Sequence, residues 1–165
     1  MNSFPKSIEK IRSDSPKSYV SLELSNLLFL DIETTGLRPD RGAKITEVSI
    51  LDRNSQQHYW RTEADIESDM AAKELPNILF QLKRGVVVGH NLKFDFWFIA
   101  YECDKYGVKG PDIQFIDTLS LSRKLLPDRS SYKLGELLKL FDIKVNGELH
   151  TATADAEATR ALFWK

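Results

Sequence analysis

Residues 27–37 read LLFLDIETTGL and combine an apolar segment, two carboxylates and a turn. The first four residues are apolar, as in a strand that is buried in the core of a domain. Asp31 and Glu33 follow two positions apart, and side chains two apart on a strand point to the same face of the sheet. The TTG that comes next predicts a sharp turn. This stretch therefore predicts a buried strand whose end presents two neighbouring carboxylates.

Two carboxylates side by side repel each other, which raises the pKa of one of them. A divalent cation bound between them removes this repulsion, because hard cations prefer oxygen ligands. The alternative is that Asp31 and Glu33 mark a solvated strand end. The buried strand directly before them and the turn directly after them favour the cation site.

Hydrophobic periodicity predicts the remaining elements of the chain. Residues 44–51 alternate apolar and polar side chains and pair as a hairpin with residues 56–62, while residues 86–89 and 113–116 predict two further strands. Helices are expected over residues 68–84, 93–106 and 117–126, with Pro76 kinking or splitting the first. The second carries the apolar stripe Phe94, Trp97, Phe98 and Tyr101.

Two more helices are expected near the end of the chain. Leu134, Leu137, Leu138 and Phe141 mark one of them, and the last begins at about Ala154 with Thr153 as the candidate N-cap. A hairpin followed by α/β crossovers implies an α/β fold, a mixed β-sheet flanked by helices. We expect one domain over residues 27–165, preceded by a partly ordered N-terminal extension over residues 1–26.

Two further segments carry chemically active side chains. Residues 86–95, VVVGHNLKFD, form a buried strand and a short turn that leads to Asp95 in the first turn of a helix. Residues 150–159, HTATADAEAT, place His150 five positions before Asp155. Taken singly, Asp95 and Asp155 are explained as carboxylates that complement a helix dipole, and His150 as an ordinary loop histidine.

In this order, DIETTGL, GHNLKFD and HTATAD resemble the three motifs of the DEDDh family of 3′→5′ exonucleases, which includes proofreading subunits of replicative polymerases. The resemblance covers about residues 27–165 and implies a ribonuclease-H-like fold. It implies that Asp31, Glu33, Asp95 and Asp155 hold two divalent cations, Mg²⁺ or Mn²⁺, and that His150 is the general base.

The resemblance also suggests substrate contacts. The turn with Thr34, Gly36 and Leu37 would lie under the terminal sugar, and Leu37 would wedge against the last base. Asn91 and Phe94 would contact the terminal nucleotides, although Phe94 belongs equally to the apolar stripe of its helix. The expected substrate is the 3′ end of single-stranded DNA. An RNA or oligoribonucleotide substrate, a domain that docks on a polymerase, and a binding module without turnover remain as alternatives.

Composition restricts the class of protein. The 165 residues carry a net charge of −1 with a pI near 6.3, which argues against a protein that coats long stretches of nucleic acid. An enzyme that grips a strand end is compatible with this charge, because bound metal ions supply local positive charge. No apolar run approaches the ~20 residues that cross a membrane, and the first residues lack a secretory signal. With Cys103 as the only cysteine, we expect an intracellular, cytoplasmic location.

Overall fold

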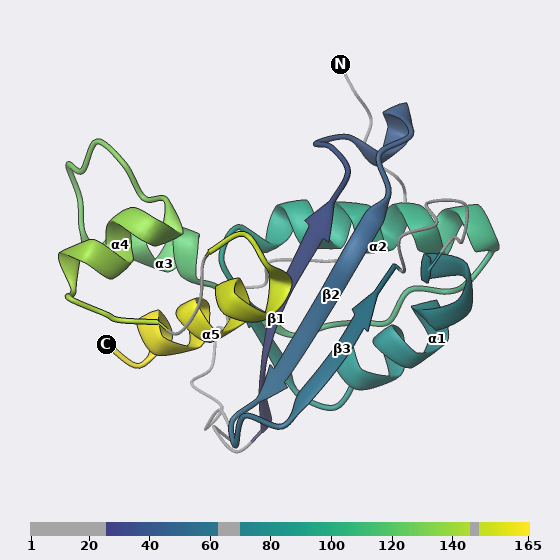
Figure 1. The fold of residues 1–165 in the computed structure, drawn as a ribbon, viewed down its shortest axis with the longest axis horizontal. Helices are drawn as coiled ribbons and strands as arrows, with labels where there is room; N and C mark the ends of the chain where they lie inside the picture. Colours follow the sequence, from purple (N-terminus) through teal and green to yellow (C-terminus); the bar gives the residue numbers. More distant parts are fainter. Residues whose placement is uncertain (1–25, 63–69, 146–148) are drawn as a thin grey trace.

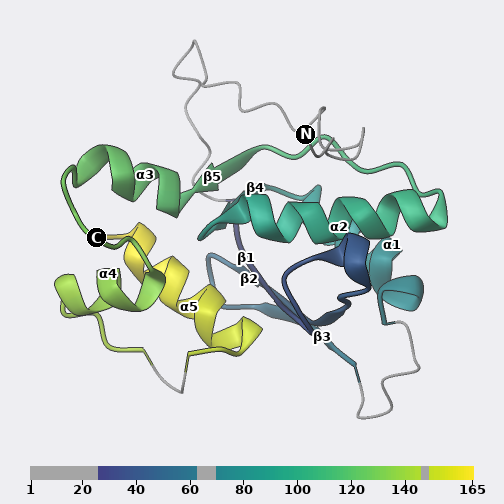
Figure 2. The same cartoon turned by 90° about the horizontal axis from the view of Figure 1, so that it is seen from above.

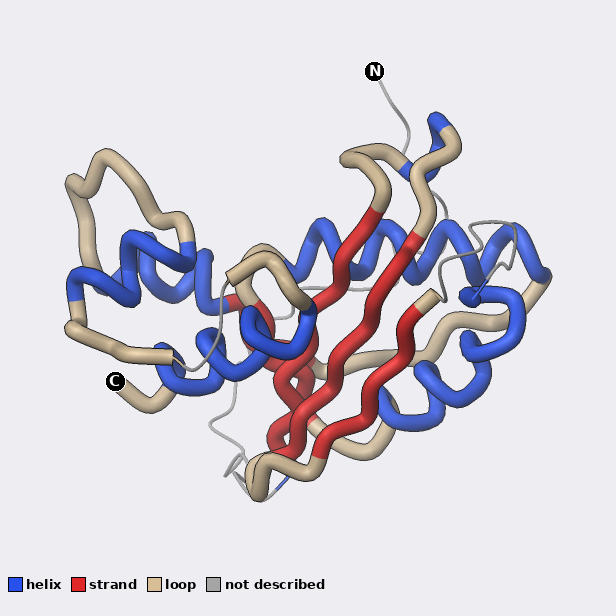
Figure 3. The backbone as a smooth tube through the Cα atoms, viewed as in Figure 1, coloured by secondary structure: helices blue, strands red, loops and turns tan. Residues whose placement is uncertain are grey.

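The order of the strands in the sheet puts the strand with Asp31 at its centre. The computed structural model describes residues 26–62, 70–145 and 149–165, so most of the expected N-terminal extension lies outside the described residues. The strands are β1 (Leu27–Thr34), β2 (Ile45–Asp52), β3 (Gln57–Arg61), β4 (Val86–Gly89) and β5 (Phe115–Asp117), arranged in the order β3-β2-β1-β4-β5. The pairs β1–β2 and β2–β3 are antiparallel, whereas β1–β4 and β4–β5 are parallel. The predicted mixed sheet is confirmed, and β1, β2 and β3 run side by side in Figure 3.

The helices follow the predicted order around this sheet. They are η2 (Pro39–Arg41, a 3₁₀ turn), α1 (Met70–Leu82), α2 (Leu92–Tyr106), α3 (Thr118–Leu125), α4 (Leu134–Leu140) and α5 (Ala152–Phe163). Their arrangement is drawn in Figure 1, where α5 crosses beside β1 and β2. Among the described residues, no helix is both long and apolar enough to span a bilayer.

Each face of the sheet is covered by different helices. Residues paired across β1 and β2 share a face, so Phe29, Asp31 and Glu33 lie on one side with Leu51, Ser49 and Glu47. This side packs against α5 through Ala156 and Phe163. The alternate β1 residues Leu28, Leu30 and Ile32 join a larger core with α1 and α2 on the other side. Figure 2 shows α2 and α5 on opposite sides of the sheet.

The structure corrects several details of the sequence prediction. The last helix begins at Ala152, and its N-cap is Thr151, whose side chain accepts a hydrogen bond from Ala154 N, so the assignment of Thr153 was wrong. Pro76 lies inside one helix and does not split it. The short strand β5 starts at Phe115, two residues later than expected.

The apolar stripe of α2 was also only partly right. Of the four predicted residues, only Phe98 is fully buried, while Phe94, Trp97 and Tyr101 are half-buried. The deeply buried residues are Leu92, Asp95, Phe96, Phe98, Ile99, Ala100, Glu102 and Cys103. A helix packed against a sheet and a second helix buries more than one narrow stripe, which is why the four-residue pattern was incomplete.

Candidate active site

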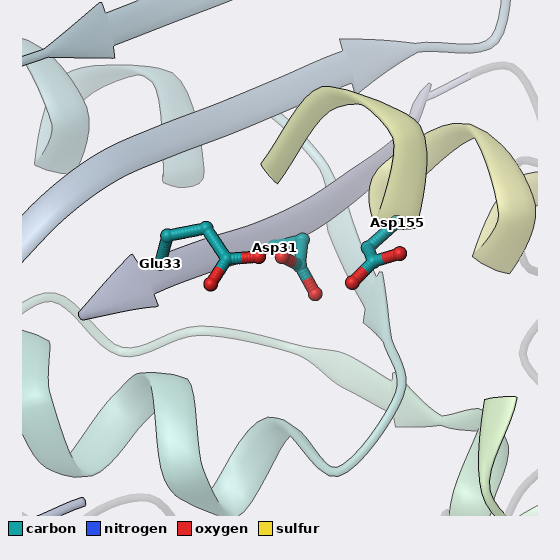
Figure 4. A group of neighbouring side chains, drawn as sticks. All are labelled: Asp31, Glu33 and Asp155. Carbon is teal, nitrogen blue, oxygen red and sulfur yellow. The ribbon is translucent and has the colours of Figure 1, made fainter. Parts of the chain in front are cut away.

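Three carboxylates meet where α5 crosses β1. Asp31 and Glu33 lie on the α5-covered face of β1, and Asp155 comes from the first turn of α5. Each side chain offers one oxygen atom, and these three atoms lie within 4.8 Å of one another. Figure 4 shows the three side chains grouped between β1 and α5. The predicted convergence of these acids from distant chain segments is therefore observed in the structure.

Asp95 reaches the same strand from α2, on the other side of the sheet. The pairing of β1 with β4 ends at Phe29 and Val88, so the rest of β1 extends beyond its parallel neighbour. There the Oδ1 atom of Asp95 accepts a hydrogen bond of 3.2 Å from Ile32 N. The fourth predicted acid is thus bound to the backbone between Asp31 and Glu33.

A glycine allows this close approach of α2 to β1. A Cβ atom on Gly89, the last residue of β4, would lie 2.3 Å from Leu92 Cδ2 and 3.0 Å from Leu30 O. Leu92 is the first residue of α2, and Asn91 before it adopts a left-handed backbone conformation with φ of 71°. The tight turn through Gly89 and Asn91 therefore sets the distance between Asp95 and β1.

Burial raises the pKa values of all four acids, and repulsion between carboxylates adds to this effect for three of them. Burial raises the pKa of Asp31 well above its ordinary value, and the charges of Asp95, Asp155 and Glu33 raise it further. Burial also raises the pKa of Asp95 to about 8, against the lowering effect of its hydrogen bond from Ile32 N. The pKa values of Glu33 and Asp155 are raised as well, with burial as the main cause. The site thus concentrates four carboxylates whose pKa values are all raised above their ordinary values.

These carboxylates fit a divalent cation. Their ligand atoms are hard oxygen donors, which match Mg²⁺ and Mn²⁺ and do not favour soft metals. A cation would also relieve the mutual repulsion that raises the pKa values. Asp31, Glu33 and Asp155 form the group that could hold one ion. Asp95 lies beside them and raises the pKa of Asp31.

His150 lies directly before the helix that carries Asp155. His150 is exposed and has a left-handed backbone conformation with φ of 81°. Its backbone N–H donates a hydrogen bond of 3.4 Å to Asp155 Oδ1. The imidazole is also close enough for its charge to lower the pKa values of Glu33 and Asp155. The structure therefore brings the predicted histidine to the carboxylates, with its side chain open to solvent.

The predicted substrate residues lie around this site in different settings. In the turn after β1, Thr34 Oγ1 donates to Gly36 O at 2.7 Å, and Leu37 is 78% exposed. Asn91 is exposed at the start of α2, whereas Phe94 is half-buried and packs against Phe98 with 5.0 Å between ring centroids. The packing role of Phe94 is thus observed, and nucleotide contacts of all five residues remain predictions.

Three neighbouring polar residues were missed in the sequence. Glu47 on β2 lies opposite Glu33 and accepts a hydrogen bond from Ala152 N. Asp117, at the end of β5, accepts hydrogen bonds from Asn91 N and two groups of α3. His90 forms hydrogen bonds with Thr118 Oγ1 and Tyr132 O, both at 2.9 Å, and burial lowers its pKa. The alternation of apolar and polar residues over 44–51 could have placed Glu47 on the same face of the sheet as Glu33.

The fold and the cluster of acids define an exonuclease domain of the DEDDh type. The family model described as Exonuclease (RNase_T) matches residues 50–163, and the chain belongs to this family. The matched residues include Asp95, His150 and Asp155 but begin after Asp31 and Glu33. The structure places Asp31 and Glu33, from the first motif, beside Asp155, from the third. Members of the DEDDh family use divalent metal ions, in agreement with the chemistry of these acids.

The chain resembles segments of larger bacterial proteins. It is 31% identical over 156 residues to the 3′-5′ exonuclease DinG of Bacillus subtilis, a match that covers 81% of this chain and 17% of DinG. It is 28% identical over 174 residues to the PolC-type DNA polymerase III of Lacticaseibacillus paracasei, with 93% of this chain and 12% of the polymerase covered. The chain thus spans less than a fifth of the length of either relative.

A solved structure supports the fold. The nuclease domain of 3′hExo, a DEDDh family member bound to rAMP, superposes with a TM-score of 0.60 at 17% identity. The match covers 82% of this chain and 88% of that domain. The predicted ribonuclease-H-like architecture is therefore confirmed.

Proposed function

We propose that this chain is a 3′→5′ exonuclease that removes nucleoside 5′-monophosphates one at a time from the 3′ end of a DNA strand, either single-stranded or frayed. The observation that carries the proposal is the grouping of Asp31, Glu33 and Asp155 with Asp95 and His150 at one place on the sheet. These residues come from three segments of the chain, and their types match the hydrolysis of a phosphodiester bond.

The roles follow from the position of each side chain. Asp31, Glu33 and Asp155 would hold a divalent cation, and Asp95 beside Asp31 would help to hold a second one. When bound, such ions activate the attacking water and stabilise the charge on the leaving 3′ oxygen. His150 would accept the proton of that water, because its exposed imidazole lies beside Asp155 and a neutral ring nitrogen is a proton acceptor. The turn with Thr34, Gly36 and Leu37 would support the terminal nucleotide.

The preference for DNA rests on the relatives. One is named a 3′-5′ exonuclease and the other a DNA polymerase III, and both match most of this chain. RNA is the second candidate, because the domain of 3′hExo with the same fold was solved with rAMP bound. The near-neutral charge of −1 further favours action on a strand end, with a polymerase or another nucleic-acid-processing partner that adds affinity for the substrate.

The test is hydrolysis of 5′-labelled single-stranded DNA and RNA of the same sequence, with Mg²⁺, with Mn²⁺ and with excess chelator. We expect a ladder of products that shorten stepwise from the 3′ end, stronger on DNA than on RNA, and none in chelator. Asp31→Ala and His150→Ala should remove nearly all activity. Glu136→Ala is the matched control, since Glu136 is exposed on α4 and pairs only with Lys139 on its own helix among the contacts described.

Two results would contradict the proposal. Full activity in excess chelator would exclude the metal-dependent reaction. Release of the 5′-labelled mononucleotide as the first product would show the opposite direction. A faster reaction on RNA would keep the exonuclease and assign the second substrate.

A further inference from the structure

Glu47 is a buried carboxylate beside the site that has no place in the three motifs. It lies on β2 directly opposite Glu33 and on the same face of the sheet, and only 9% of its surface is exposed. Its charge raises the pKa values of Asp31 and Glu33. A fifth carboxylate therefore adds to the repulsion at the site, and a specific interaction must compensate for its burial.

Contacts with Ala152, Arg61 and Tyr59 provide this compensation. The Oε2 atom of Glu47 accepts a hydrogen bond of 3.3 Å from Ala152 N, and its Oε1 atom lies 3.3 Å from Arg61 Nε. Ala152 is the first residue of α5, so the carboxylate binds an N–H group that has no partner within the helix. The start of a helix also favours a negative charge through its dipole. Glu47 thus attaches the beginning of α5 to the sheet.

Ala152 lies in the sequence between His150 and Asp155, the two proposed functional residues of this segment. Ala152 follows His150 by two positions and precedes Asp155 by three, and His150 N itself donates to Asp155 Oδ1. Thr151 completes the turn as the N-cap by accepting from Ala154 N. A shift of Ala152 would therefore move the imidazole and the α5 carboxylate together.

Other contacts between the β2–β3 hairpin and α5 lie farther from the site. Gln57 Nε2 donates to Thr153 Oγ1 at 2.6 Å, and Arg160 forms a hydrogen bond with Ser55. These pairs are exposed, whereas the bond between Glu47 and Ala152 N is buried. A buried hydrogen bond is protected from competing water, so Glu47 restrains the start of α5 more strongly than these two exposed pairs do.

We propose that Glu47 is a positioning residue, which holds the start of α5 so that His150 and Asp155 face Asp31 and Glu33. This inference rests on the proposed exonuclease function. Glu47 acts through its hydrogen bond to Ala152 N, so an acceptor oxygen at this place, charged or neutral, keeps most of the effect. Residues that orient metal ligands typically contribute 10–100-fold to metal affinity or activity.

The test compares Glu47→Ala, Glu47→Gln and the control Glu136→Ala. In Glu47→Gln the amide oxygen still accepts from Ala152 N, and Arg61, whose side chain is 68% exposed, can turn towards water. We expect kcat on single-stranded DNA to fall about 10–100-fold in Glu47→Ala, with KM within about threefold of wild type. Both Glu47→Gln and Glu136→Ala should keep kcat within about threefold.

Two further measurements do not depend on turnover. The amide hydrogen exchange of Ala152, followed by NMR without metal, should accelerate about tenfold or more in Glu47→Ala and remain near wild type in Glu47→Gln. Binding of Mn²⁺ should weaken about tenfold in Glu47→Ala, because Asp155 moves away from Asp31 and Glu33. If the wild-type protein lacked nuclease activity, the proposed function would fail, while these two measurements would still decide the role of Glu47.

Three outcomes would overturn the inference. A kcat in Glu47→Gln as low as in Glu47→Ala would show that the charge of Glu47 acts directly, as in a metal ligand. A wild-type kcat in Glu47→Ala, with only a lower melting temperature, would show a purely structural role. Unchanged exchange of the Ala152 amide in Glu47→Ala would show that Glu47 does not restrain the start of α5.

Discussion

Without metal, the free energy of unfolding of this protein should fall as the pH rises from 5 to 7. Replacement of Asp95 by asparagine should remove much of this fall. Asp95 is buried beside Asp31, and its pKa is raised to about 8. In the unfolded chain an aspartate titrates at about 3.9. The folded protein therefore keeps a proton on Asp95 over a pH range in which the unfolded chain has lost it. Asparagine resembles the protonated carboxyl, and its Oδ1 atom can still accept the hydrogen bond from Ile32 N.

The size and sign of the effect follow from proton linkage. When the folded state binds more protons than the unfolded state, the free energy of unfolding falls as the pH rises. The stability is therefore complete below a pH of about 3.9 and is lost progressively up to the folded pKa of about 8. One such group loses about 1.4 kcal/mol per pH unit, or about 2.5 kcal/mol between pH 5 and pH 7. The raised pKa values of Asp31, Glu33 and Asp155 add contributions of the same sign.

The assay is urea unfolding in excess chelator at pH 5, 6 and 7, followed by the fluorescence of the three tryptophans. The loss of unfolding free energy from pH 5 to pH 7 should be smaller by about 2.5 kcal/mol in Asp95→Asn than in wild type. Asp112→Asn, at an exposed position between α2 and β5, should behave like wild type. Equal losses in wild type and Asp95→Asn would refute the reasoning, because Asp95 would then ionise alike in the folded and unfolded states.

Three further predictions concern stability. Gly89→Ala should destabilise the protein by about 1–3 kcal/mol in urea unfolding, because the new Cβ would lie 2.3 Å from Leu92 Cδ2. Gly110→Ala, where the new Cβ would meet no atom within 4 Å beyond its chain neighbours, should change the stability by less than about 1 kcal/mol, and equal effects would argue against the steric reason. Thr151→Ala should cost about 1 kcal/mol through loss of the N-cap, clearly more than Thr153→Ala, and the reverse order would restore the original assignment. Mn²⁺ at 100 times its dissociation constant should stabilise the protein by about 2.7 kcal/mol at pH 7, and an unchanged melting temperature would exclude a metal site in the folded state.

Local patterns in the sequence were enough to predict the elements and the main acids. The strand that carries Asp31 and the helix that carries Asp95 were predicted because apolar periodicity depends only on nearby residues. The shared face of Asp31 and Glu33 follows from the two-residue repeat of a strand, and the structure shows it. The order of the three motifs indicated the DEDDh family, which the family model and the fold confirm.

Other features were decided only by contacts between distant parts of the chain. The hydrogen bond of Asp95 to Ile32 spans 63 residues, and that of Glu47 to Ala152 spans 105 residues. The latter holds an N–H group of the first turn of α5, which explains why the helix begins after Thr151 and not after Thr153. Such pairs leave no periodic signal, because the free energy of a long-range hydrogen bond depends on how the sheet and helices pack. The sequence by itself thus indicated which acids group together on the sheet, and the tertiary structure decided what holds them in position.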